Sequence, residues 1–172
     1  MGSILGSELE TIYEELAGRL MRYFQLQGLT EAGAEDLTQE TLFRMLVSWS
    51  AFRRDAALST WAFAIARTVL ADHYRALTKE TRSYPSTASP PVPTPEEEVL
   101  HREEHRLVHS ALVRLSPDDR SLLIWREYEG MSYKDIGHMT GWPLGVVKVR
   151  LYRARKRLQS AYERLERGAG KS

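Results

Sequence analysis

The 172-residue chain contains no cysteine, and this absence excludes three kinds of chemistry together. Disulfide bonds, thiolate metal ligands and a cysteine nucleophile all need a thiol. Such a composition suits a reducing cytoplasm, where disulfides are rare. We therefore expect a cytoplasmic protein.

Long apolar runs are missing as well. No stretch approaches the roughly 18 apolar residues that a membrane-spanning helix needs. Residues 1–7 lack the basic and apolar regions of a secretory signal, and Gly6 breaks the myristoylation pattern that begins at Gly2. No segment alternates apolar and polar residues with a period of two, so no β-strands are predicted.

Motifs typical of enzymes are absent too, including glycine-rich phosphate loops and the G-x-S-x-G elbow. His101, His105 and His109 lie four residues apart, a spacing that could form a metal-binding helix face. Arg102 stands where zinc proteases carry a glutamate, so a solvated helix is the favoured interpretation. We expect neither catalysis nor a cofactor, with a metal-dependent enzyme as the alternative.

The chain does have charge that changes sign along its length. The net charge is +1, but residues 1–50 carry −5, residues 51–82 carry +3, residues 83–133 carry −4 and residues 134–172 carry +7. This alternation indicates separate surfaces for separate partners. A run of charge can equally be a solvated face, so the motifs must decide.

Proline divides the chain into two parts. Residues 83–95 read SYPSTASPPVPTP, and five prolines in thirteen residues cannot sustain a helix or a sheet. This composition predicts a flexible, proline-rich linker between a domain at 1–82 and a domain at 96–172.

Both parts are predicted to be helical, because apolar residues recur at spacings of three and four. The stripes are Leu9, Ile12, Leu16, Leu20 and Tyr23; Leu37, Thr41, Met45 and Trp49, widened by Leu42 and Leu46; Ala62, Ile65, Ala66 and Val69; and Leu100, Leu107, Ala111 and Leu115. Ser59 is expected to cap the third of these helices. The fold class is therefore all-α, with two small helical domains.

Helix boundaries are marked more clearly near the C-terminus. Ser116 and Pro117 predict a helix start, and Gly130 predicts its end. Ser132 is expected to cap a short helix that the sequence Gly141-Trp142-Pro143 breaks. A last helix is predicted from about Leu144 to Leu165.

The segment from about Ser132 to Leu158 is predicted to be a helix-turn-helix, because its short turn forces two helices to cross steeply. Val147, Leu151, Ala154 and Leu158 form the expected buried seam. The other faces carry one tyrosine and six cations: Lys148, Arg150, Tyr152, Arg153, Arg155, Lys156 and Arg157. A helix this basic favours a polyanion, and the turn and seam favour DNA over a solvated helix or an RNA-binding tail.

Three blocks of sequence resemble the extracytoplasmic-function sigma factors of bacterial RNA polymerase. Residues 34–41 (AEDLTQET) resemble the polymerase-binding signature of that family. Residues 59–67 (STWAFAIAR) with 72–75 (DHYR) resemble its promoter-melting segment, and residues 132–136 (SYKDI) with 141–155 (GWPLGVVKVRLYRAR) resemble its second domain. The blocks occur in the family's order around the predicted linker, so the two parts resemble sigma regions 2 and 4.

The first block carries a polar helix face with an apolar centre, made by Asp36, Gln39, Glu40, Phe43 and Arg44. The resemblance implies that this face binds the clamp helices of the β′ subunit of core polymerase. Ordinary pairing of Glu40 with Arg44 along the helix would explain the charges alone.

The second block follows a loop from Phe52 to Leu58, and the resemblance implies that this loop holds a base flipped from the single-stranded −10 element. The candidate contacts are Phe52, Arg53, Arg54, Asp55, Ala56 and Ala57 on the loop, with Arg67, His73 and Arg75 on the next helix. Trp49, Trp61 and Phe63 are candidates for stacking on bases, although core packing is the commoner role of such rings.

The third block implies recognition of duplex DNA at the −35 element through Lys148, Val149, Tyr152 and Arg153. The neighbouring DNA-binding candidates are Arg150, Lys156 and Arg157. The chain departs from the family pattern where Val146 replaces the usual threonine and Val149 the usual serine. A valine can contact a thymine methyl but cannot form a hydrogen bond.

The predicted function is that of an alternative sigma factor that binds core polymerase and starts transcription at particular promoters. The resemblance further implies an anti-sigma factor, which holds the protein inactive until a stress signal releases it. The main alternative is a freestanding helix-turn-helix regulator that dimerises through the stripe from Leu100 to Leu115.

Overall fold

The structure is a computed structural model that describes residues 2–81 and 99–170, with side chains described from 10 to 79 and from 104 to 170. The chain forms two compact units, one of residues 1–25 and 29–89 and the other of residues 26–28 and 90–172. All the regular elements of the described residues are helical, as the sequence predicts. The predicted linker, 83–95, lies outside the described residues.

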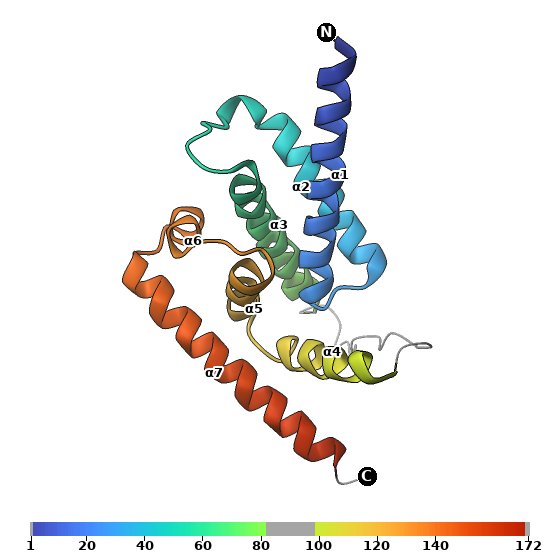
Figure 1. The fold of residues 1–172 in the computed structure, drawn as a ribbon, viewed down its shortest axis with the longest axis vertical. Helices are drawn as coiled ribbons and strands as arrows, with labels where there is room; N and C mark the ends of the chain where they lie inside the picture. Colours follow the sequence, from blue (N-terminus) through green and yellow to red (C-terminus); the bar gives the residue numbers. More distant parts are fainter. Residues whose placement is uncertain (1, 82–98, 171–172) are drawn as a thin grey trace. The chain divides into compact units, whose positions relative to one another are not determined.

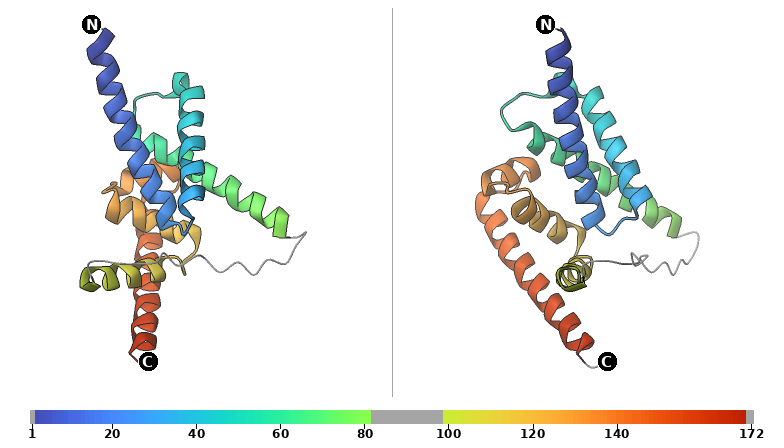
Figure 2. Two further views of the ribbon diagram at one scale, coloured as in Figure 1. Left: turned by 90° about the vertical axis from the view of Figure 1, so that its right-hand side faces the viewer. Right: turned by 45° about the vertical axis from the view of Figure 1, so that its right-hand side comes forward.

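The first unit contains helices α1 (Gly2–Leu26), α2 (Glu31–Val47) and α3 (Leu58–Thr81), with a short 3₁₀ turn η1 (Trp49–Ala51) (Figure 1). Helices α1 and α2 lie side by side, and α3 crosses them (Figure 2). The core residues of this unit are Leu16, Leu20, Tyr23, Phe24, Ala34, Leu42, Met45, Ala62, Phe63, Ala66, Val69 and Leu70. The Tyr23 and Phe63 rings meet edge to face, with centroids 5.5 Å apart, and so join α1 to α3.

Four expectations for this unit were wrong in detail. Ile12 and Leu46 belong to the predicted stripes but are exposed, because each stripe is wider than the surface its neighbours cover. Trp49 is exposed as well, because α2 ends at Val47 and Trp49 begins η1. Ser59 does not cap α3. The helix begins at Leu58, and the Trp61 backbone N–H donates to the carbonyl of Ala57, which places Ala57 at the cap.

The second unit contains α4 (Val99–Leu112), α5 (Pro117–Leu123), a π-helical turn η2 (Ile124–Tyr128), α6 (Tyr133–Thr140) and α7 (Leu144–Ala169). Helices α4, α5 and α6 each pack against the long α7 (Figure 1). The core residues of the second unit are Ala111, Leu112, Leu115, Leu122, Leu123, Ile124, Trp125, Met131, Ile136, Val147, Leu151 and Ala154. Helix α7 runs four residues beyond its predicted end.

The predicted caps of this unit are confirmed. The Ser116 side chain accepts from the Asp119 backbone N–H, and Pro117 occupies the first turn of α5. Ser132 accepts from the Asp135 backbone N–H at 3.0 Å, while the Asp135 carboxylate accepts from the Ser132 backbone, forming a capping box. Gly130 ends the preceding helix with φ +63°, as its position predicted. None of the described helices is long and apolar enough to cross a membrane.

Candidate functional site

The first candidate surface is the outward side of α2. Asp36, Gln39, Glu40 and Phe43 are all exposed, because the opposite side of the helix buries Thr38, Thr41, Leu42 and Met45 in the core. The Phe43 side chain is 61% exposed although it is large and apolar. The structure therefore brings four of the five residues predicted in this block onto one accessible surface.

Val47 belongs to the same surface and was missed by the sequence analysis. It follows Asp36, Glu40 and Phe43 at helical spacing and is 70% exposed. We call the residues Asp36, Gln39, Glu40, Phe43 and Val47 the α2 face. The spacing that identified Phe43 would have found Val47 had the stripe been continued for one more turn.

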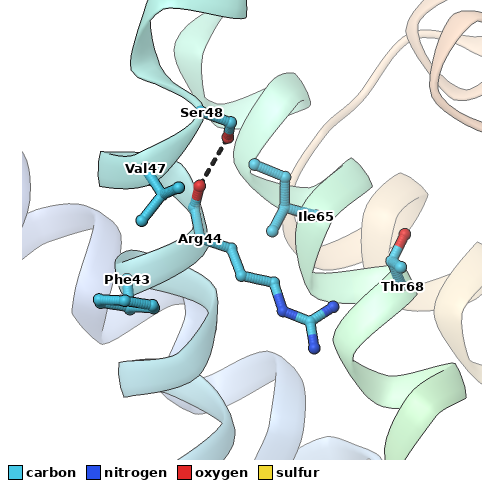
Figure 3. A pocket seen from close by; sticks show the side chains of 6 residues that line it. All are labelled: Phe43, Arg44, Val47, Ser48, Ile65 and Thr68. Atoms are coloured by element: carbon cyan, nitrogen blue, oxygen red, sulfur yellow. Dashed lines mark hydrogen bonds between the residues drawn. The ribbon is translucent and has the colours of Figure 1, made fainter.

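A shallow pocket of about 360 Å³ opens beside the α2 face. Phe43, Arg44, Val47 and Ser48 line it from α2 and its C-terminal end, and Ile65 and Thr68 line it from α3 (Figure 3). The lining is mostly apolar side chain, so this part of the surface can accept an apolar side chain of a partner.

Arg44, the fifth predicted residue, turns toward α3 instead. Its Nε lies 2.7 Å from Oε1 of Glu40, and its Nη1 lies 2.8 Å from Oδ2 of Asp72 on α3. The other oxygen of Asp72 binds Nη2 of Arg75 at 2.5 Å. Asp72 therefore links Arg44, predicted to bind polymerase, to Arg75, predicted to bind DNA.

These contacts shift the pKa of two groups. The hydrogen bond from Arg44 is the largest cause that lowers the pKa of the Asp72 carboxyl, and the charges of Arg44 and Arg75 add to it. Hydrogen bonds to Glu40 and then to Asp72 raise the pKa of the Arg44 guanidinium. Both groups are charged at neutral pH in any case, and the two shifts widen the pH range over which the ion pair between α2 and α3 persists.

The second candidate surface is the loop between η1 and α3. Arg53, Arg54, Asp55 and Ala57 are exposed, while Phe52 and Ala56 are half-buried. Arg54 has φ +56°, in the left-handed region that residues other than glycine rarely adopt. Such strain often accompanies a functional loop.

Three rings gather at the base of this loop, and we call Trp49, Phe52 and Trp61 the aromatic cluster. The ring centroids are 4.9 Å apart for Phe52 and Trp61, 5.8 Å for Trp49 and Phe52, and 6.1 Å for Trp49 and Trp61. Trp49 is 46% exposed, so it can receive a further ring on its outer side. Phe63 is fully buried against Tyr23 and belongs to the core, so it cannot stack on a base.

The structure does not gather the α3 candidates into one site. His73 and Arg75 are two residues apart and therefore point to nearly opposite sides of the helix. Arg67 and His73 are half-buried, and Arg75 is exposed beside Asp72.

The third candidate surface lies on α7. Val147, Leu151 and Ala154 are fully buried, and Leu158 is half-buried, so the predicted seam is confirmed. On the opposite side, five predicted residues are exposed and make no ion pair with the described residues. We call them the reading face: Lys148, Val149, Tyr152, Arg153 and Lys156.

Three arginines of α7 bind the protein itself. The Arg150 guanidinium lies 4.1 Å from the centroid of the Trp142 ring. Arg155 donates from Nη2 to Glu127 at 2.6 Å, a bond that raises its pKa, as does a hydrogen bond with Tyr133. Arg157 Nη1 lies 2.6 Å from Oδ2 of Asp119, whose side chain is 10% exposed. These pairs fix α7 on its own domain.

The turn before α7 depends on two glycines. Gly141 has φ +74° and ends α6, its N–H donating to the Gly137 carbonyl at 2.8 Å. A Cβ at Gly137 would lie 3.0 Å from the backbone oxygen of Trp142, so the turn folds closely over this residue. Pro143 then leads directly into α7.

The structure describes the side chains of two of the three histidines that the sequence places on one helix face. His105 is exposed and His109 is half-buried, whereas the side chain of His101 lies outside the described residues. The side chains that the structure describes include no group of three or more potential ligands placed to hold a metal ion.

Comparison with known proteins finds two matching families. Residues 12–80 match the model of sigma-70 region 2, and residues 105–158 match that of sigma-70 region 4. The chain is 31% identical over 147 residues to the RNA polymerase sigma-H factor of Pseudomonas aeruginosa, covering 79% of this chain and 76% of that protein. It is 34% identical over 138 residues to the ECF RNA polymerase sigma factor SigC of Mycobacterium tuberculosis, covering 76% and 71%.

A solved structure has the same fold. The sigma factor RpoE from Bartonella quintana, crystallised with the anti-sigma factor NepR, is 24% identical to this chain and has a TM-score of 0.76. The likeness covers 91% of this chain and 97% of RpoE.

Proposed function

The chain belongs to the extracytoplasmic-function sigma factors of the sigma-70 family, and we infer from this membership how its surfaces act in transcription. Its role is that of an alternative sigma factor, a transcription initiation factor. The observation that carries the proposal for individual residues is that the α2 face and the reading face are exposed, as are Trp49 of the aromatic cluster and Arg53, Arg54, Asp55 and Ala57 of the loop. We assign the protein no catalysis of its own and place its work in the cytoplasm, with the polymerase.

The α2 face is the proposed docking surface for core polymerase, through the clamp helices of the β′ subunit. Asp36, Gln39 and Glu40 offer polar groups beside an apolar patch of Phe43 and Val47 at the C-terminal end of α2. This arrangement suits a protein interface, where a desolvated apolar centre is surrounded by polar groups. Arg44 shapes the surface indirectly, because it holds α2 to α3 through Asp72.

The loop and the aromatic cluster are the proposed site for single-stranded DNA of the −10 element. Arg53 and Arg54 are exposed and follow Trp49, the exposed ring of the aromatic cluster, by four and five residues in the sequence. Proteins commonly hold unpaired bases by stacking them on an exposed ring with cations nearby. Phe52, Asp55, Ala56 and Ala57 complete the loop. Arg67, His73 and Arg75 remain predicted contacts to the DNA backbone.

The reading face is the proposed site for duplex DNA of the −35 element. It lies on the second helix of a helix-turn-helix, and the first turns of such a helix enter the major groove. Arg150 and Arg157 also remain predicted DNA contacts, although each contacts the protein in the structure.

The protein can bind both promoter elements at once, because the residues between its two domains, proposed at 1–82 and 96–172, connect them. Once polymerase holds one domain, the tether raises the effective concentration of the other at its own element. We further propose an anti-sigma partner that masks these surfaces, by analogy with the complex in which RpoE was solved.

In vitro transcription with core polymerase, followed by start-site mapping, tests the function. We expect the chain to direct core enzyme to discrete start sites, each preceded by shared −35 and −10 sequences. A chain that forms a stable dimer in gel filtration and leaves core polymerase inactive would instead support the freestanding regulator.

Two exposed apolar residues, one on the α2 face and one on α1, provide a matched test of the docking surface. Val47→Asp should weaken binding to core polymerase at least tenfold, because it places a charge in the apolar patch of the interface. Ile12→Asp, at a residue of α1 that is 46% exposed, should leave binding unchanged. Fluorescence anisotropy measures the affinity of each variant for core polymerase. If both variants bound like the unaltered chain, the assignment of the α2 face as the docking surface would be wrong.

A further inference from the structure

The N-terminal end of the reading face carries an apolar residue, Val149. Val149 lies two residues from Val147 and two from Leu151, so it points away from the buried seam, and it is 48% exposed. Val146 flanks it and is 38% exposed. A valine side chain has no polar atom, so neither residue can form a hydrogen bond with a base edge.

The helix can approach DNA closely at this point. Gly145 lies one turn before Val149 on the same side of α7, and a Cβ there would meet nothing within 4 Å. Because no side chain separates the backbone from the groove at residue 145, Val149 can come near the groove floor.

The charges around Val149 identify the partner as duplex DNA. Lys148 precedes it in the chain, and Arg153 and Lys156 follow one and two turns later on the same side of α7. All three are exposed and make no ion pair with the described residues. Cations in these positions suit the phosphates on either side of a major groove. A helix held there by its cations places the valine against base edges.

Thymine is the base that suits an apolar side chain in the major groove, because it alone presents a methyl group there. Every base loses water from polar edge atoms beside a valine, but only thymine gains an apolar contact in return. We propose that Val149, with Val146 beside it, selects thymine at one position of the −35 element through the C5 methyl group. This inference rests on the proposed −35 role of the reading face.

The test removes the methyl group and nothing else. Holoenzyme made with the full chain is titrated with promoter duplexes in which each −35 thymine, on either strand, is replaced singly by deoxyuridine. One replacement should weaken binding about fourfold, which is the contribution of burying one methyl group. Unchanged affinity at every position, or a −35 element without thymine, would overturn the proposal.

Variants then assign the methyl contact to a residue. Val149→Ala should bind the thymine and deoxyuridine duplexes equally, whereas Arg153→Ala should bind both more weakly and keep the fourfold difference. Val149 is exposed, so its replacement leaves the core intact. A Val149→Ala protein that kept the full difference would refute the assignment.

Two further duplexes separate this proposal from the −35 role itself. If cytosine replaces the critical thymine, 5-methylcytosine should bind more tightly than cytosine, because it restores the methyl group. A duplex with a scrambled −35 element tests the underlying function. Equal binding of the native and scrambled elements would mean that −35 recognition fails, whereas a preference for the native element without any methyl effect would overturn only the role of Val149.

Discussion

Asp72 illustrates how much one carboxylate can determine in the first domain. It is absent from the predicted contacts, yet it accepts hydrogen bonds from Arg44 at 2.8 Å and from Arg75 at 2.5 Å. Arg44, which lies next to the α2 face, and Arg75, a predicted DNA contact, therefore share one carboxylate. Removing it would break both ion pairs and leave Arg44 bound to Glu40 alone.

The stability that Asp72 contributes should depend on pH. Because Arg44 lowers its pKa in the folded state, the contribution is complete above the ordinary carboxyl value of 3.8 and is lost as pH falls through the lowered value. Asp72→Asn should therefore lower the free energy of unfolding by about 0.5–1 kcal/mol at pH 7. This difference should shrink as the pH is lowered below 4.

Urea unfolding at a series of pH values provides the measurement, with Asp55→Asn in the exposed loop as the control. The control should leave the stability near that of the unaltered chain. A difference between Asp72→Asn and the unaltered chain that persisted at the lowest pH would show that the ion pairs are not its source.

Arg157 and Lys156 are adjacent cations with different expected roles. Arg157→Ala removes the partner of Asp119, a nearly buried carboxylate, and should lower the free energy of unfolding by about 1–2 kcal/mol. Lys156→Ala should leave stability unchanged but weaken DNA binding for all sequences and reduce its salt dependence by about one unit. If Arg157→Ala left unfolding unchanged, the pair with Asp119 would contribute no stability, and Arg157 would act only as a DNA contact.

The helix-turn-helix shows at the scale of elements how a short turn determines the direction of the next helix. Gly137→Ala should lower stability most, because its Cβ would press against the rigid backbone of Trp142. Gly141→Ala should cost about 1 kcal/mol, because alanine tolerates φ +74° poorly.

Gly145→Ala is the matched control for this series. Residue 145 is helical and its Cβ would be unobstructed, so alanine should raise helix stability by about 0.5–1 kcal/mol. Thermal unfolding of the three variants gives the order directly. A Gly137→Ala protein as stable as Gly145→Ala would mean that the turn can open without cost.

Local sequence predicts helix ends well where a side chain itself makes the cap. Ser116 and Ser132 were identified correctly because their hydroxyl groups bond to a backbone N–H three residues later. Ser59 failed the same rule because α3 begins one residue before it, at Leu58. The π-helical turn at Ile124–Tyr128 had no signal in the pattern, which follows the ordinary helical period.

At the scale of the whole molecule, the tether between domains should be tolerant of length. Inserting about ten Gly-Ser residues within 83–95 should reduce promoter binding by holoenzyme only about two- to threefold, because effective concentration falls slowly with linker length. Filter binding to a promoter with both elements measures the effect. A loss as large as that from deleting the −35 element would show that the tether has a fixed geometry.

Local sequence patterns predict the all-α class, the order of the three family blocks and the helix-turn-helix, because helical period, caps and turn residues act over a few neighbours. They also predict the buried seam of α7. The tertiary structure decided which side chains remain available to partners. It brought Glu127 and Asp119 to Arg155 and Arg157 across 28 and 38 residues of chain, and Asp72 to Arg44 across 28. Contacts between such distant residues depend on how helices pack, and the spacing of residues within one helix carries no information about them.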